Sequence, residues 1–123
     1  MKLTRGTTLN PVFLEALGKI AALPIPVKDA VRLMKLITKI GEETDITHSV
    51  KDKVFVEFGV TSIGPKGIEY AEGADATKEE AFIAKFNELV NEEFEVEFEP
   101  MALPEGTNIS VRDLTVLKDF LEL

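Results

Sequence analysis

The stretch of residues 27–58 lies between Pro26 and Gly59, contains no proline, and constrains the fold more than any other part of the sequence. Its apolar residues recur at the three- and four-residue spacing of one helix face. Those residues are Val27, Val31, Leu33, Met34, Ile37 and Ile40, continued by Ile46, Val50, Val54 and Phe58. The pattern predicts one long helix over 27–58 whose apolar stripe faces the core.

Two features leave alternatives open within this stretch. Gly41 could end the helix there, or only weaken it by about 1 kcal/mol relative to alanine. Residues 54–58 also alternate between apolar and polar side chains as a strand does. We favour the continuous helix because the four-residue spacing persists on both sides of Gly41.

The N-terminal part predicts a shorter helix that packs back on the long one. Asn10 can cap the free amides of a helix that begins at Pro11, where proline loses no needed donor. Pro24 and Pro26 push the residues before them out of the helical region and should end that helix. A helix over 11–22 and a stiff corner are therefore expected.

The C-terminal half predicts both helices and strands. Gly64–Gly67 is typical of a tight turn, which gives a hairpin or an irregular loop within 60–76. Thr77 and Glu80 form a capping-box pattern at the start of a helix over 78–92. Ser110 and Asp113 favour a helix over 111–122, with Val111, Leu114, Leu117 and Phe120 or Leu121 facing the core.

The segment EFEVEFE, residues 93–99, alternates strictly between glutamate and apolar residues. A strand there would bury Phe94, Val96 and Phe98 and expose a row of four carboxylates. Pro100 should end it. Together these elements predict an α+β fold, and a chain of this length is expected to form a single domain spanning 1–123.

Charge is distributed unevenly along the chain, although the net charge is −8. Seven of the 14 basic residues but only two of the 22 acidic residues lie within 1–41. We therefore single out two groups of interaction residues. The basic edge of the long helix comprises Lys28, Arg32, Lys35 and Lys39, and the acidic row comprises Glu93, Glu95, Glu97 and Glu99.

No catalytic, cofactor-binding or metal-binding motif is found in the sequence. His48 is the single histidine and lies in no nucleophile or HExxH pattern, and the chain has no cysteine. The carboxylates do not follow the spacing of a calcium loop. We therefore expect no enzyme activity and no cofactor. The N-terminus lacks the apolar core of a signal peptide, and no apolar run reaches the roughly 20 residues that span a bilayer.

The order of segments resembles that of small uncharacterised proteins encoded by tailed bacteriophages and prophages. Residues 86–96, FNELVNEEFEV, match the helix-to-strand junction of those proteins, and residues 109–114, ISVRDL, match the start of their closing helix. The resemblance covers most of the chain and implies a phage setting, in the host cytoplasm or the virion. It implies no activity and supplies no catalytic or binding residues.

These observations lead us to expect a non-enzymatic protein that acts by protein–protein contact, as a structural or assembly component such as a head–tail or tail accessory protein. The partner could be a second copy, with the basic helix of one copy meeting the acidic row of the next. The alternative is an acidic mimic of nucleic acid that inhibits a host nucleic-acid-binding protein. We expect no direct nucleic-acid binding, because the overall charge repels phosphates. We also expect no membrane association.

Overall fold

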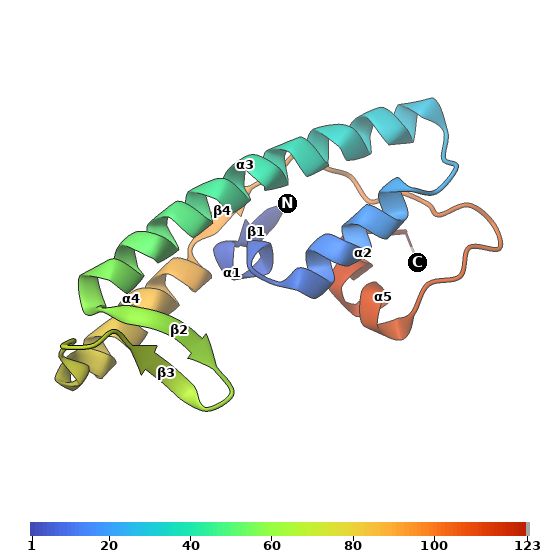
Figure 1. The fold of residues 1–123 in the computed structure, drawn as a ribbon. Helices are drawn as coiled ribbons and strands as arrows, with labels where there is room; N and C mark the ends of the chain where they lie inside the picture. The colour runs from blue at the N-terminus through green and yellow to red at the C-terminus, as the bar shows by residue number, and fades with distance from the viewer. Residues whose placement is uncertain (123) are drawn as a thin grey trace.

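The computed structural model describes residues 1–122 and confirms the α+β class. In chain order the elements are β1 (Lys2–Thr4), α1 (Arg5–Thr8), α2 (Pro11–Ala21), α3 (Val27–Phe58), β2 (Val60–Gly64), β3 (Gly67–Tyr70), the 3-10 turn η1 (Ala76–Lys78), α4 (Glu79–Asn91), β4 (Glu93–Glu95), α5 (Val111–Leu117) and the 3-10 turn η2 (Lys118–Phe120). The long helix α3 runs along the molecule. The helices α2 and α5 lie near its first half, and α4 and the β2–β3 hairpin lie near its last turns (Figure 1).

The helix α3 continues through Gly41, as the sequence predicted. A Cβ atom built on Gly41 would meet no atom within 4 Å, so nothing inside the chain requires glycine there. The helix ends at Gly59, which adopts the left-handed conformation with φ of 66°. A Cβ atom on Gly59 would lie 2.6 Å from the Cβ atom of Ala74, so both the backbone and the packing favour glycine.

The predicted core face of α3 was partly wrong. The buried apolar residues of the helix are Leu33, Leu36, Ile40 and Val54, whereas Val27, Val31, Met34, Ile46 and Val50 are exposed. The other elements pack against only one side of α3 (Figure 1). A helix with apolar residues on two sides therefore buries one set and leaves the other in solvent.

The helix α2 begins as the sequence predicted, because the Asn10 side chain accepts a hydrogen bond of 3.0 Å from the amide of Val12. It buries Phe13, Ala16, Leu17 and Ile20.

The strands β1 and β4 pair antiparallel, with Leu3 opposite Phe94. Sequence reasoning missed β1 and the four-residue helix α1, which are too short to show a hydrophobic period.

The predicted strand 93–99 was too long. The β1–β4 ladder ends at Glu95, followed by one further bond of 2.9 Å from the amide of Val96 to the carbonyl of Met1. Phe94 and Val96 are nevertheless buried, Phe98 is partly buried, and all four glutamates of the acidic row are exposed, as the alternation predicted.

Two helix boundaries also differ from the predictions. The capping box at Thr77 does not form: the Asp75 side chain accepts the amide hydrogen bond of Thr77, and residues 76–78 form a 3-10 turn. The C-terminal helix ends at Leu117 instead of residue 122, because Leu121 forms a β-bridge with Met101. Ser110 caps α5 as predicted, but Val111 is 80% exposed and does not face the core.

Hydrophobic side chains form two clusters at the two ends of α3. The larger cluster joins α2, the first half of α3, the segment after β4 and α5, with Phe13, Leu36, Val96 and Leu117 at its centre. The smaller cluster, built around Val54, Val60 and Phe82, joins the last turns of α3 to the hairpin and α4. Edge-to-face contacts link Phe82 to Phe55 and Phe58 in this smaller cluster.

Candidate interaction surface on α3

The four residues of the predicted basic edge differ in their surroundings. Arg32 donates hydrogen bonds to Asp29 and to the carbonyl of Glu99, and its guanidinium lies 5.2 Å from the centre of the Phe98 ring. Lys39 forms an ion pair of 2.9 Å with Glu43. Lys28 and Lys35 are exposed and form no ion pair with any residue of 1–122.

The acidic row lies beside the basic edge in the same molecule. One hollow of about 410 Å³ is lined by Lys35 and Lys39 on one side and by Glu95 and Glu97 on the other. A neighbouring hollow of about 540 Å³ also includes Arg32 and Glu99. The amino group of Met1 lies 3.3 Å from the Glu95 carboxylate. Because the two charged groups are adjacent, they do not form opposite ends of the molecule.

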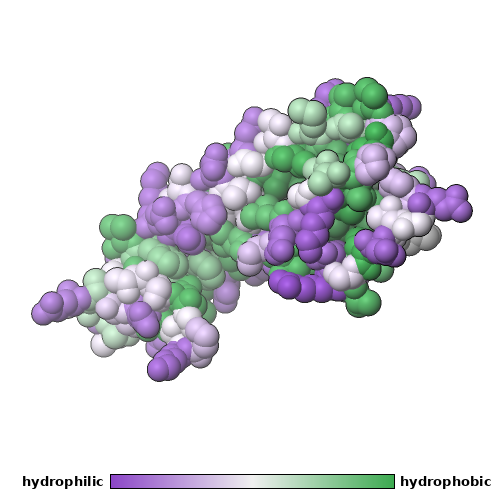
Figure 2. Space-filling model, turned by 45° about the vertical axis from the view of Figure 1, so that its right-hand side comes forward, coloured by the Kyte–Doolittle hydropathy of each residue, from purple (hydrophilic) through white to green (hydrophobic). Residues whose placement is uncertain are grey.

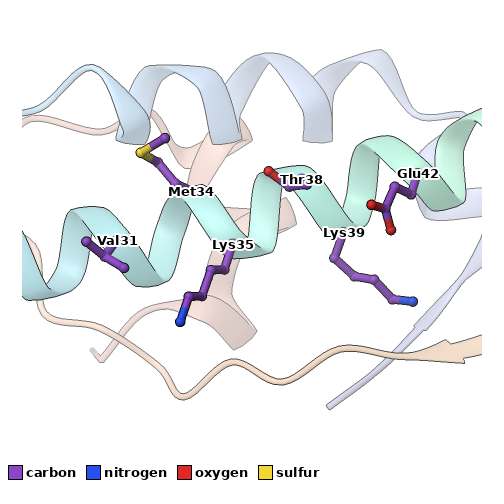
Figure 3. Close-up of a pocket in the computed structure, with 6 residues that line it drawn as sticks. All are labelled: Val31, Met34, Lys35, Thr38, Lys39 and Glu42. Carbon is purple, nitrogen blue, oxygen red and sulfur yellow. The ribbon is translucent and has the colours of Figure 1, made fainter.

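The outward side of α3 carries a third feature, which the sequence analysis had assigned to the core. A shallow hollow of about 570 Å³ lies over Thr38 and is lined by Val31, Met34, Lys35, Thr38, Lys39 and Glu42 (Figure 3). Positions 31, 34, 35 and 38 have the i, i+3, i+4, i+7 spacing of the hole that one helix offers to a side chain of another helix. Positions 35, 38, 39 and 42 repeat that spacing one turn further on.

We define the outer strip of α3 as the exposed residues that continue this surface along the helix. They are Val27, Lys28, Val31, Met34, Lys35, Thr38, Glu42, Asp45, Ile46, Ser49, Val50 and Asp52. Val27 and Met34 are 80% and 68% exposed, which is unusual for large apolar side chains that lie together. Figure 2 shows hydrophobic surface at the end of the molecule where α3 begins.

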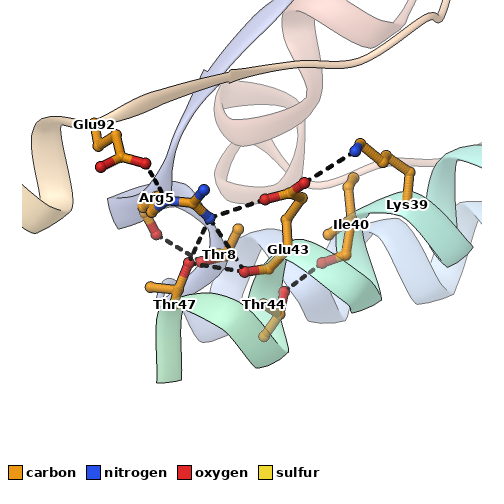
Figure 4. A network of polar contacts seen from close by, with 8 residues as sticks. All are labelled: Arg5, Thr8, Lys39, Ile40, Glu43, Thr44, Thr47 and Glu92. Carbon is orange, nitrogen blue, oxygen red and sulfur yellow. Dashed lines mark hydrogen bonds and ion pairs between the residues drawn. The ribbon is translucent and has the colours of Figure 1, made fainter. Parts of the chain in front are cut away.

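A partly buried polar network holds α1 against α3 and the end of α4 (Figure 4). Arg5 forms ion pairs of 2.9 Å with Glu43 and with Glu92, and its guanidinium lies 5.5 Å from the centre of the Phe94 ring. The hydroxyl of buried Thr47 donates to the carbonyl of Glu43 and lies 3.4 Å from the Arg5 guanidinium. Each charged side chain of the network forms an ion pair within it, so we assign the network a structural role.

The pKa values in this network shift in the directions that favour the charged forms. A hydrogen bond from Lys39 lowers the pKa of Glu43 most strongly, burial opposes this effect, and Arg5 adds to the lowering. Burial alone would lower the pKa of Arg5, but the carboxylates of Glu92 and Glu43 raise it above its ordinary value. Outside the network, the hydrogen bond from Lys19 lowers the pKa of Asp113.

Other predicted features lie apart from this surface. His48 is exposed on α3. Within residues 1–122, no three histidine or acidic side chains come together in a way that could hold a metal ion. No helix in the same range is long and apolar enough to cross a membrane.

Sequence reasoning identified the charged residues of the surface but missed how they are arranged. The exposure of Val27, Val31 and Met34 could not be read from their spacing, because the same helical period describes a buried face. In comparisons with protein-family models, curated proteins and solved structures, no match to this chain was found.

Proposed function

We propose that this chain is a non-enzymatic protein of a tailed phage or prophage that acts by protein–protein contact. In this proposal it is a structural or assembly component, such as a head–tail or tail accessory protein. The phage setting is supported by the resemblance of residues 86–96 and 109–114 to such proteins.

The observation that carries the contact role is the outer strip of α3. Large apolar side chains there remain in water at a cost of about 25 cal/mol for each Å² that a partner could cover. The hollow over Thr38 is open and has the spacing that receives side chains from a helix. Such a surface suits a protein partner better than a small substrate, which is usually enclosed by a concave pocket.

The alternative function, an acidic mimic of nucleic acid, remains a prediction with less support. A mimic presents a continuous negative surface to a basic groove. Here Arg32, Lys35, Lys39 and the amino group of Met1 lie next to the acidic row. These cations weaken the negative field that the four glutamates would otherwise produce.

The proposal is tested with phage particles produced with the wild-type chain or with a variant of it. We expect the wild-type protein to co-purify with particles or with one particle component, as measured by quantitative mass spectrometry. Met34→Glu places a charge on the outer strip and should abolish this association. The matched control is Ile83→Glu on α4, because Ile83 is also exposed, at 43%.

The control should leave the association unchanged. Absence of the wild-type protein from particles and from every particle component would contradict the assembly role. Equal retention of Met34→Glu and wild type would show that the outer strip is not the contact surface.

A further inference from the structure

Charge changes sign along the outer strip of α3. In its first half the exposed charged residues are Lys28 and Lys35, and in its second half they are Glu42, Asp45 and Asp52, followed by Lys53. Within residues 1–122, none of these six side chains forms an ion pair. By contrast, Arg32, Lys39 and Glu43, which lie nearer the rest of the molecule, are all paired.

Apolar residues are present in both halves of the strip. The first half contains Val27, Val31 and Met34, and the second half contains Ile46 and Val50, which are 47% and 38% exposed. The strip therefore has an apolar and basic half followed by a mixed apolar and acidic half. A surface of this kind is complementary to itself when one copy is reversed relative to the other.

We propose that two copies of this chain pair antiparallel through the outer strips of their α3 helices, with the twofold axis at the level of residue 40. This inference rests on the proposed function, because it names the partner of the same contact surface. A residue at position i then lies opposite position 80 − i of the other copy. Thr38 and Glu42 flank the axis, where the hollow over Thr38 receives a side chain from the second helix.

This register brings unlike charges to the same level of the two helices. Lys35 lies opposite Asp45 of the second copy, and Lys28 lies opposite Asp52, so twofold symmetry gives four ion pairs. Val31 lies at the level of Ser49 of the second copy, whereas Met34 lies along one flank of the pair and Ile46 of the second copy along the other. Lys53, the remaining exposed cation near this surface, lies opposite Val27, where its alkyl stem covers the valine.

A parallel pair is disfavoured by the same residues. It would place Lys28 and Lys35 opposite their own copies and would do the same for Asp45 and Asp52. Like charges held together raise the free energy of the complex, whereas the antiparallel pair converts each of these contacts into an attraction. The charge pattern therefore selects both the partner and its direction.

The predicted interface is small, so the dimer should be weak. From residue 28 to residue 52 the strip is about 36 Å long, and a helix with its side chains is about 10 Å wide. Interfaces of this size belong to weak or transient complexes. We expect a dissociation constant of tens to hundreds of micromolar that increases with salt, because its ion pairs are exposed.

The test uses two charge-reversed variants of the full chain. In a homodimer of Lys28→Glu/Lys35→Glu, both members of all four facing pairs are acidic. In a homodimer of Asp45→Lys/Asp52→Lys, both members of all four pairs are basic. In a mixed dimer of the two variants, all four ion pairs are restored with reversed polarity. Both variants keep a net negative charge, so general attraction between unlike proteins does not explain their association.

Sedimentation velocity up to about 500 µM should detect the wild-type dimer. Each variant alone should raise the dissociation constant at least about tenfold, and the mixture should return to within about threefold of wild type. Lys66→Glu/Lys118→Glu, which changes the net charge equally at exposed residues outside α3, should dimerise as wild type does. Circular dichroism establishes that each variant is folded.

A wild-type chain that stays monomeric, or a mixture of variants that fails to associate, would overturn the self-pairing. The proposed function would fail separately, if the chain makes no Met34-dependent contact with a phage particle. A monomer that still makes that contact would show that the outer strip binds a different protein.

Discussion

At the scale of single residues, the Arg5–Glu43 ion pair is the contact that ties α1 to α3. Arg5 also contacts Glu92, so one side chain joins α1, α3 and the end of α4. The side chains of Arg5 and Glu43 are both 11% exposed. An ion pair shielded from solvent in this way leaves an unpaired charge when one partner is removed.

Glu43→Gln should lower the free energy of unfolding by about 2 kcal/mol, because hydrogen bonds to charged groups contribute about this much. The substitution keeps the shape of the side chain but removes the charge that faces Arg5 and Lys39. Urea unfolding measures the effect. Glu42→Gln, an exposed neighbour with no ion pair among residues 1–122, should change stability by less than about 0.5 kcal/mol. Equal effects of both variants would rule out this role for Glu43.

The same ion pairs predict the direction of the pH dependence. The pKa of Glu43 in the folded chain is lowered from its ordinary value of 4.5, so the unfolded chain takes up protons first as pH falls. The stabilisation is complete above the ordinary value and is lost as pH falls through the folded pKa. Asp113 acts in the same direction.

Unfolding curves between pH 7 and pH 2 should therefore show a decrease in stability on the acid side that is smaller for Glu43→Gln than for wild type. A variant with the same acid dependence as wild type would contradict the assignment to Glu43.

Sequence reasoning could not identify this network, because Arg5 and Glu43 belong to elements that are far apart in the chain. It did predict the caps formed by Asn10 and Ser110, since each cap bonds to an amide only two or three residues away. Residue-scale features were therefore predictable where the contact is local.

At the scale of elements, the main feature is the continuity of α3 through Gly41 and its end at Gly59. The positions and types of the three longer helices were predictable from periodicity and turn residues. The orientation of α3 was not, because its apolar residues lie on two sides and only tertiary packing decides which side is buried. The short β1 and α1 gave no periodic signal.

Gly41 within α3 and Gly59 directly after it should respond oppositely to substitution by alanine. Gly41→Ala should raise the free energy of unfolding by about 1 kcal/mol, because alanine is the better helix former and its methyl group meets no atom. Gly59→Ala should lower it by at least about 1 kcal/mol, because the left-handed backbone is strained in alanine. Thermal unfolding of the two variants measures both signs. If Gly41→Ala lowered the free energy of unfolding, that result would contradict the open surroundings of Gly41.

At the scale of the whole molecule, α3 contributes residues to both hydrophobic clusters. The single-domain prediction therefore depends on whether both clusters unfold together. Tyr70 packs against the smaller cluster, and it is the single tyrosine of a chain without tryptophan. Its fluorescence reports the smaller cluster, whereas far-UV circular dichroism reports mainly the helices.

We expect the two signals to give coincident urea transitions, as a single cooperative unit requires. Phe82→Ala, which removes a buried ring from the smaller cluster, should shift both transitions together and cost about 3 kcal/mol. Separate midpoints would show that the hairpin and α4 form an independent folding unit.

Also at this scale, the arrangement of charge differs from the one that the sequence suggested. The basic edge and the acidic row were expected to meet between copies, but they lie side by side in one molecule. Exposed charges without an ion pair also lie along the outer strip of α3, and their order along the helix leads to the antiparallel pair.

A distance measurement between two copies tests the antiparallel pair. Because the chain has no cysteine, Val56→Cys provides a single site for a spin label on an 81% exposed residue of α3, outside the proposed contact. The antiparallel pair centred at residue 40 predicts a distance of about 50 Å between the two labels by pulsed electron paramagnetic resonance. A distance of about 10 to 20 Å, as parallel helices would give, or no defined distance at concentrations where dimers form, would contradict the account.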